Sequence, residues 1–140
     1  MPHPVKLRSR AVERVIARVR KLCLALPESS ERLSHGEPTF FVGAKAGRGG
    51  KVFTMFSNDH HGDGIVGIWL PAAPGAQELL VEADPKRFFR PPYVGPSGWV
   101  GIRLDVSPVD WDEIAEHVLE SWRLVAPKKV LAAFDATTRA

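Results

Sequence analysis

Six basic side chains within the first 51 residues could contact phosphate groups. They are Arg14, Arg18, Lys21, Lys45, Arg48 and Lys51. The first three recur at spacings of four and three residues, which places them on one face of a helix. The last three flank or fall within the glycine-rich stretch 46–50 (AGRGG), which suits the tip of a β-hairpin. Cations on such surfaces displace the counterions of nucleic acids, and no aromatic side chain lies among them to stack on bases.

The formal net charge of +3 is unevenly distributed along the chain. Residues 1–53 contain 11 Lys or Arg against 4 Asp or Glu, whereas residues 54–140 contain 8 against 12. The N-terminal part is therefore predicted to face an anionic partner, with an ordinary solvated surface as the alternative. The glycine-rich stretch is not a P-loop, because Lys45 stands where that motif needs its first glycine and Val52 where it needs Ser or Thr.

A turn between two predicted strands carries a candidate metal site. His60, His61 and Asp63 lie within residues 58–64 (NDHHGDG), and a turn can bring neighbouring side chains together. Imidazole and carboxylate groups suit zinc, iron or nickel, but no obvious fourth ligand completes a structural site. Asn, Asp and Gly also supply the local hydrogen bonds of a tight turn, so an ordinary turn is the alternative.

A proline- and aromatic-rich stretch, residues 84–99, is a candidate ligand site. Arg87, Arg90, Tyr93 and Trp99 could line a pocket for a small anionic ligand. The alternative is an ordered loop that is held by burial of its own aromatic side chains. No Gly-x-Ser-x-Gly sequence is present to expose a nucleophilic serine, so we expect no catalytic residues.

Helices and strands must position these residues. Apolar residues at spacings of three and four predict a helix over 9–26, with Cys23 on its buried stripe. Further helices are predicted over 74–83 and from Asp110, with Glu113 in capping-box spacing; Pro127 interrupts the last one, and 128–134 add a turn or two. Strands are predicted over 39–45, 51–57, 65–70 and 100–106. The resulting order α-βββ-α-β-α, with short connections between strands, predicts an α+β two-layer domain with a mostly antiparallel sheet.

Length and composition fit a globular protein. With 140 residues, 44% of them apolar and 25% charged, we expect one domain spanning 1–140 with a core at about 9–134. One cysteine excludes a disulfide framework and favours a reducing, cytoplasmic location. The longest uncharged stretch, 64–77, has 14 residues, fewer than the roughly 20 of a membrane span.

Several motifs are similar to those of the MmcQ/YjbR family of small bacterial proteins. The similarity runs through residues 35–41 (HGEPTFF), 50–53 (GKVF), 59–64 (DHHGDG), 91–95 (PPYVG), 98–101 (GWVG) and 121–128 (SWRLVAPK). It covers residues 12–134, and it departs at Trp122, where many relatives have Tyr. The resemblance implies a frataxin-like (CyaY-like) sandwich in which helices pack on one face of an antiparallel sheet.

The resemblance also bears on function, because family members are commonly labelled DNA-binding from a proposed double-wing arrangement. It supplies no set of catalytic residues. We therefore expect a non-enzymatic, cytoplasmic DNA-binding protein, a monomer or weak homodimer without cofactor, whose first helix and first hairpin contact phosphates. The alternative is a small-ligand or metal-binding accessory protein that uses the His60-His61 turn or the loop from Arg87 to Trp99.

Overall fold

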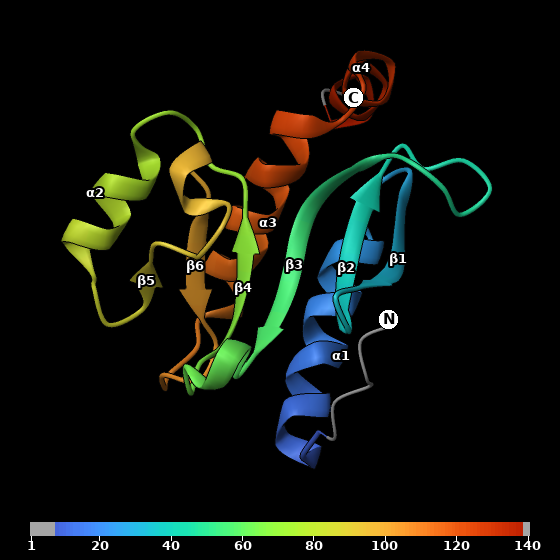
Figure 1. The fold of residues 1–140 in the computed structure, drawn as a ribbon. Coiled ribbons are helices and arrows are strands. Elements are labelled where there is room, and N and C mark those ends of the chain that lie inside the picture. The colour runs from blue at the N-terminus through green and yellow to red at the C-terminus, as the bar shows by residue number, and fades with distance from the viewer. Residues whose placement is uncertain (1–7, 139–140) are drawn as a thin grey trace.

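A six-stranded sheet forms the centre of the computed structural model, which describes residues 8–138 (Figure 1). The strands lie in the order β1-β2-β3-β4-β6-β5, and every neighbouring pair is antiparallel. Their bounds are β1 Ser29–Ser34, β2 Glu37–Val42, β3 Lys51–Asn58, β4 Val66–Leu70, β5 Phe88–Phe89 and β6 Val100–Arg103. The α+β class and the antiparallel sheet expected from the sequence are confirmed.

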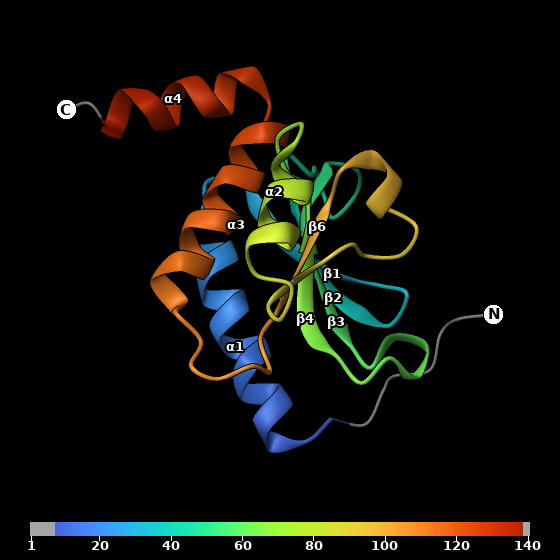
Figure 2. The ribbon, with the colours of Figure 1, turned by 90° about the vertical axis from the view of Figure 1, so that its left-hand side faces the viewer.

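Helices α1 (Arg10–Leu24) and α3 (Trp111–Val125) pack on one face of this sheet, as Figure 2 shows. Helix α2 (Ala76–Ala83) lies beside the β5 edge, and α4 (Lys128–Thr138) extends away from the end of α3. Among residues 8–138, no α-helix packs on the other face of the sheet, which we call the helix-free face (Figure 2). No helix among residues 8–138 is long and apolar enough to cross a membrane.

The core lies between the sheet and the two helices. Phe56, Ile68 and Ile102 are partners across three neighbouring strands, so their side chains share one face. This row belongs to a buried cluster that also contains Ile16, Val19, Cys23, Val118 and Trp122 from α1 and α3. Cys23 is fully buried in this cluster, which confirms the prediction that this cysteine is part of the apolar stripe. Burial also raises the pKa of its thiol to about 12.

Strand β1 was not expected from the sequence. Its residues, Ser29–Ser34, are mostly polar and only half-buried, because β1 is an edge strand. It pairs with β2 through a two-residue connection, His35 and Gly36, whose φ values of 53° and 79° are those of a tight hairpin turn. A glycine at the second position of a two-residue loop was the available signal for this hairpin.

The stretch 84–99 contains a short strand, although the sequence predicted only a loop. Phe88 and Phe89 pair with Ile102 and Gly101 of β6. The Phe89 ring lies directly on Gly101, where a Cβ would overlap the ring. The predicted strand 100–106 ends at Arg103, where the guanidinium binds Asp105 at 2.9 Å.

Helix α3 begins as predicted, with Asp110 as its N-cap, but Glu113 does not complete a capping box. The Asp110 carboxylate accepts hydrogen bonds from the backbone N–H groups of Asp112 and Glu113. The Glu113 carboxylate, however, turns to the Arg87 guanidinium, with both N···O distances at 3.1 Å. The charged partner draws Glu113 away from the helix start.

Candidate functional site

Three connecting segments lie on the helix-free side of the sheet. In Figure 2 they are the β1–β2 turn, the segment between β3 and β4, and the segment between β5 and β6. Between them they border a cavity of about 480 Å³. The residues that line it and matter below are Glu37, Met55, Ser57, His60, His61, Trp69 and Tyr93.

The floor of the cavity comes from the register of β3 and β4. Met55 is the partner of Trp69, and Ser57 is the partner of Gly67, so these residues face the side opposite to the core row. Glycine is required at position 67, because a Cβ there would lie 2.5 Å from the carbonyl oxygen of Ile102. That glycine also leaves the sheet surface beside Trp69 and Ser57 without a side chain.

The turn after β3 carries the two histidines toward this floor. A short 3-10 helix, His60–Gly62, follows Asp59, whose φ of 51° is left-handed. The Asp59 carboxylate accepts a hydrogen bond from the Gly64 backbone N–H at 2.8 Å, and the Asp63 carboxylate accepts one from the N–H of Ile65 at 2.9 Å. Both carboxylates therefore stabilise the turn itself, as its Asn/Asp/Gly content suggested.

Aromatic rings meet at the mouth of the cavity. The ring centroid of His60 lies 5.0 Å from that of Trp69 and 5.7 Å from that of Tyr93, at interplanar angles of 77° and 86°. The ring centroids of His61 and His60 are 4.2 Å apart, and Nε2 of His61 is 3.2 Å from the hydroxyl oxygen of Tyr93. The two stretches that the sequence offered as separate ligand candidates, 58–64 and 84–99, thus meet over one cavity.

Two buried polar atoms of the cavity residues have no hydrogen-bond partner among residues 8–138. They are the indole Nε1 of Trp69, a residue that is 5% exposed, and the hydroxyl Oγ of Ser57, a residue that is 3% exposed. The Glu37 carboxylate, in contrast, accepts a hydrogen bond from the Asn58 backbone N–H at 2.7 Å and lies 3.9 Å from Arg8. Buried polar groups are usually satisfied, so the two atoms mark this floor as a place for a ligand group or ordered water.

The metal candidate does not assemble around the His60-His61 turn. Within the part of the chain that the structure describes, no three His, Cys, Asp or Glu side chains are grouped to hold a metal ion. The two imidazoles approach each other, while the Asp63 carboxylate is turned to the backbone of Ile65. The three residues nominated together are therefore not brought together as ligands.

Of the four candidate residues in the 84–99 stretch, Tyr93 lines the cavity, whereas Arg87, Arg90 and Trp99 are not among the residues that line it. Arg87 binds Asp84 at 2.7 Å as well as Glu113, and its hydrogen bond lowers the pKa of the Asp84 carboxyl. The Arg90 side chain packs against Gly95, and the backbone carbonyl of Trp99 accepts a hydrogen bond from Gln77.

The six basic residues come from two parts of the fold. Helix α1, which carries Arg14, Arg18 and Lys21, packs on one face of the sheet, whereas the loop 43–50 connects the ends of β2 and β3. Arg18 lies over the ring of Trp111, 4.7 Å from its centroid, at the start of α3. Lys45, Arg48 and Lys51 are exposed on the hairpin, as are Arg14 and Lys21 on α1.

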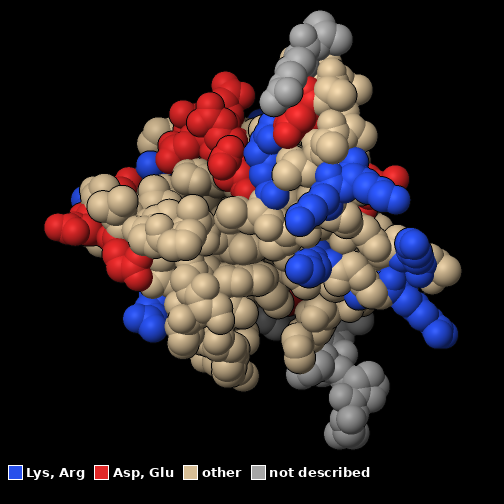
Figure 3. Space-filling model, turned by 90° about the horizontal axis from the view of Figure 1, so that it is seen from above, with Lys and Arg blue, Asp and Glu red and all other residues tan. Residues whose placement is uncertain are grey.

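Two further exposed lysines, Lys128 and Lys129, lie near the hairpin cations, and nothing local in the sequence indicates this proximity. Gly43 packs on Pro127, since a Cβ there would lie 3.1 Å from Cγ of the proline. This contact brings the exposed Lys128 and Lys129 at the start of α4 toward the base of the loop 43–50. Figure 3 shows Lys and Arg gathered on the loop side of this end and Asp and Glu on the other. We call Lys45, Arg48, Lys51, Lys128 and Lys129 the basic end.

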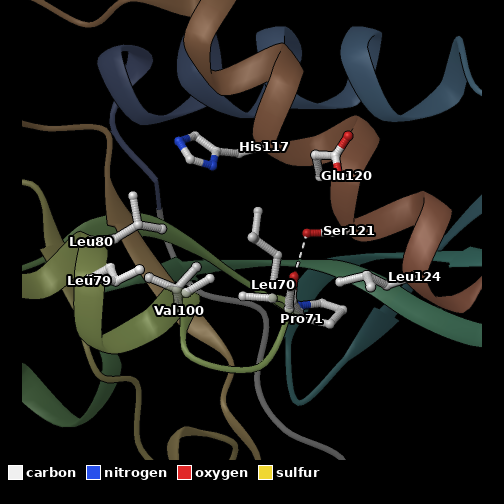
Figure 4. A pocket seen from close by; sticks show the side chains of 12 residues that line it. Leu70, Pro71, Leu79, Leu80, Val100, His117, Glu120, Ser121 and Leu124 are labelled. Carbon is white, nitrogen blue, oxygen red and sulfur yellow. Dashed lines mark hydrogen bonds between the residues drawn. The ribbon is translucent and has the colours of Figure 1, made fainter.

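A second cavity, of about 300 Å³, lies between α2, α3 and the ends of β4 and β6 (Figure 4). Its floor is apolar, with Leu70, Leu80 and Val100. The Ser121 hydroxyl donates to the carbonyl of Pro71 at 2.6 Å, as the dashed line in Figure 4 marks. Because that hydroxyl already has its partner, this cavity lacks the unsatisfied polar floor of the first.

Comparisons with known proteins agree with the motifs in the sequence. The model of the family described as YjbR matches residues 24–124. The crystal structure of protein DR2400 of Deinococcus radiodurans, which has a domain described as DUF419, is similar, with a TM-score of 0.67 and 22% sequence identity. The similarity covers 81% of this chain and 80% of that chain. No curated protein matches the sequence.

Proposed function

The chain belongs to the YjbR family, and we propose that it binds a small organic ligand in the cavity on the helix-free face of its sheet. The observation that carries the proposal is the pair of buried, unpartnered atoms, Trp69 Nε1 and Ser57 Oγ, among the cavity residues. Leaving such a group unpaired costs about 1–3 kcal/mol. A ligand that pairs with these groups removes that penalty when it binds.

The form of the cavity supports the same role. Ligand sites are concave, about 300–1,000 Å³ in volume, and lined mainly by apolar and aromatic side chains with a few polar groups. The cavity of about 480 Å³ has this character, with Met55, Trp69 and Tyr93 beside Ser57. The proposed role is binding; the His61–Tyr93 pair lies at the exposed rim of the cavity, where Tyr93 is 72% exposed.

Nuclear magnetic resonance of the full chain tests this function. The protein has 4 Trp, each with one indole N–H signal in a ¹⁵N-labelled sample, and Trp69→Phe identifies the signal of Trp69. A library of small aromatic and aliphatic compounds is added at millimolar concentration. We expect at least one compound to shift the Trp69 signal saturably and to leave that of Trp122, on the opposite face, in place. A library in which no compound moves the Trp69 signal contradicts ligand binding.

A second candidate function is DNA binding through the basic end, favoured by the contact between Gly43 and Pro127 that brings the two basic segments together. Exposed cations on one surface bind duplex DNA by releasing counterions, with a salt slope of about −0.9 for each phosphate neutralised. The cations of α1 belong to a helix that packs on one face of the sheet, and we propose that they contribute little to the DNA-binding surface.

Fluorescence anisotropy with a labelled DNA duplex tests this candidate. We expect binding in low salt that weakens steeply as salt is added, and that is lost in a Lys45→Glu/Arg48→Glu variant. An Arg14→Glu/Lys21→Glu variant is the matched control, because it reverses the same charge on α1 and should retain binding. Equal loss in both variants indicates a general effect of net charge, and absence of saturable binding at low salt rules out this function.

A further inference from the structure

The chemistry of the cavity floor restricts the ligand, given the proposed binding function. The indole N–H of Trp69 can only donate a hydrogen bond, whereas the hydroxyl of Ser57 can donate and accept. Both atoms are without a partner among residues 8–138. A ligand that satisfies the indole must therefore present an acceptor, such as a carbonyl or hydroxyl oxygen.

The rings around the cavity restrict the shape of the ligand. Trp69 and Tyr93 both stand nearly perpendicular to His60, at 77° and 86°. Aromatic rings interact through offset stacking or edge-to-face contacts, and three rings in this arrangement offer both faces and edges. Met55 adds a thioether, which also contacts aromatic rings favourably. A flat aromatic ring gains from these contacts more than an aliphatic ring of the same size.

The charges restrict the ligand further. No Lys or Arg is among the described residues that line the cavity, so an anion would lose its hydration without gaining a permanent positive partner. The Glu37 carboxylate already accepts the Asn58 backbone N–H and lies near Arg8, so it is not a free counter-charge for a cation. A cationic ammonium group, moreover, cannot accept the indole hydrogen bond.

From these three restrictions, we infer that the cavity takes an uncharged aromatic compound that carries a hydrogen-bond-accepting oxygen, with the oxygen on the Trp69 indole and the ring beside His60 and Tyr93. The inference rests on the proposed function, since it specifies the ligand of the same site. It assigns Trp69 and Ser57 as the residues that recognise the polar group of the ligand.

Three small probes of similar size test the inference on the ¹⁵N-labelled full chain. Benzamide has the ring and the carbonyl oxygen, cyclohexanecarboxamide keeps the carbonyl and lacks the aromatic ring, and benzylammonium keeps the ring and lacks the acceptor. We expect benzamide to shift the Trp69 indole signal saturably. The other two are expected to bind at least about fivefold more weakly, because each leaves one interaction unmade.

The outcomes separate the ligand class from the binding function. Cyclohexanecarboxamide binding as tightly as benzamide overturns the requirement for an aromatic ring, and benzylammonium doing so overturns the requirement for an acceptor. If none of the three moves the Trp69 signal while another library compound does, the ligand class is wrong and the cavity still binds. If nothing in the library binds, both proposals fail.

A pair of serine variants provides a matched control. Ser57→Ala removes the floor hydroxyl, and we expect it to weaken benzamide binding by about two- to tenfold. Ser121→Ala removes an equally buried hydroxyl from the other cavity and should leave benzamide binding unchanged. Unchanged affinity in Ser57→Ala removes the serine from the proposed recognition, and loss in both variants indicates that the effect is not local.

Discussion

Replacing each of two buried serines by alanine should have opposite effects on the stability of the ligand-free protein. Ser57 and Ser121 are 3% and 1% exposed. The Ser121 hydroxyl donates to the Pro71 carbonyl at 2.6 Å, whereas the Ser57 hydroxyl has no partner among the described residues. The same chemical change therefore removes a satisfied group at one site and an unsatisfied group at the other.

The magnitudes follow from the cost of burying a hydroxyl. Removing the unpaired Ser57 hydroxyl relieves a burial penalty of about 1–3 kcal/mol, reduced by a few tenths for the lower strand propensity of alanine. We expect Ser57→Ala to stabilise the protein by about 1 kcal/mol. Ser121→Ala leaves the Pro71 carbonyl without its donor, at about 1–3 kcal/mol, and regains about 0.5 kcal/mol of helix propensity. We expect it to destabilise the protein by about 1–2 kcal/mol.

Urea denaturation followed by circular dichroism measures both changes, and a thermal melt gives shifts of about 3–4 °C for each kcal/mol in a chain of this size. The measurement uses protein that has been unfolded and refolded, so that no ligand from the cell remains bound. A Ser57→Ala variant that is destabilised by more than about 1 kcal/mol would refute the reasoning, because it would mean that the hydroxyl is already satisfied in the ligand-free protein.

Three further predictions concern the core, the sheet and an ion pair. The thiol of Cys23 is buried and its pKa is raised to about 12, so we expect no reaction with a thiol reagent at pH 8 until urea unfolds the protein; mass spectrometry would detect earlier labelling. Gly67→Ala places a Cβ 2.5 Å from the Ile102 carbonyl oxygen and should lower the free energy of unfolding by about 1–3 kcal/mol, whereas an unchanged urea midpoint would mean that β4 can shift. The hydrogen bond from Arg87 lowers the pKa of the Asp84 carboxyl below its ordinary 3.8. Ionised Asp84 therefore stabilises the fold at pH values above 3.8. This stabilisation is lost as the pH falls through the lower pKa of the folded state. Asp84→Asn should therefore flatten the dependence of stability on pH in this acid range, and an unaltered profile would contradict the assignment.

The strongly patterned elements of the fold could be predicted from the sequence because their signals are local. Helix α1 has the periodicity of one buried face, and the segments that form β3 and β4 are rich in β-branched and aromatic residues. The structure has all three elements within a few residues of the expected bounds. Strands β1 and β5 could not be predicted in this way. Strand β1 is polar because it lies at the edge of the sheet, and β5 has two residues, Phe88–Phe89, and depends on Gly101 of β6.

The candidate site was only partly predictable, because its residues come from distant parts of the chain. The sequence nominated His60, His61 and Tyr93, although in two separate hypotheses. The sequence predicts only that Trp69 and Ser57 belong to strands, since nothing local distinguishes a buried polar atom that has a partner from one that has none. That difference depends on side chains that only the fold brings together; His61 and Tyr93, for example, meet at this cavity although they are 32 residues apart in the sequence.

By itself, the sequence determined the family, the α+β class and the chemical inventory of turns, cations and aromatic rings, because these depend on residue type and short spacing. Tertiary structure alone decided which of them meet. It brought the hairpin, through the contact of Gly43 with Pro127, next to the start of α4. It also left one face of the sheet without an α-helix among the described residues and placed Trp69 and Ser57 in the same cavity as the histidine turn. The physical reason is that hydrogen-bond satisfaction and charge clustering are properties of three-dimensional neighbours.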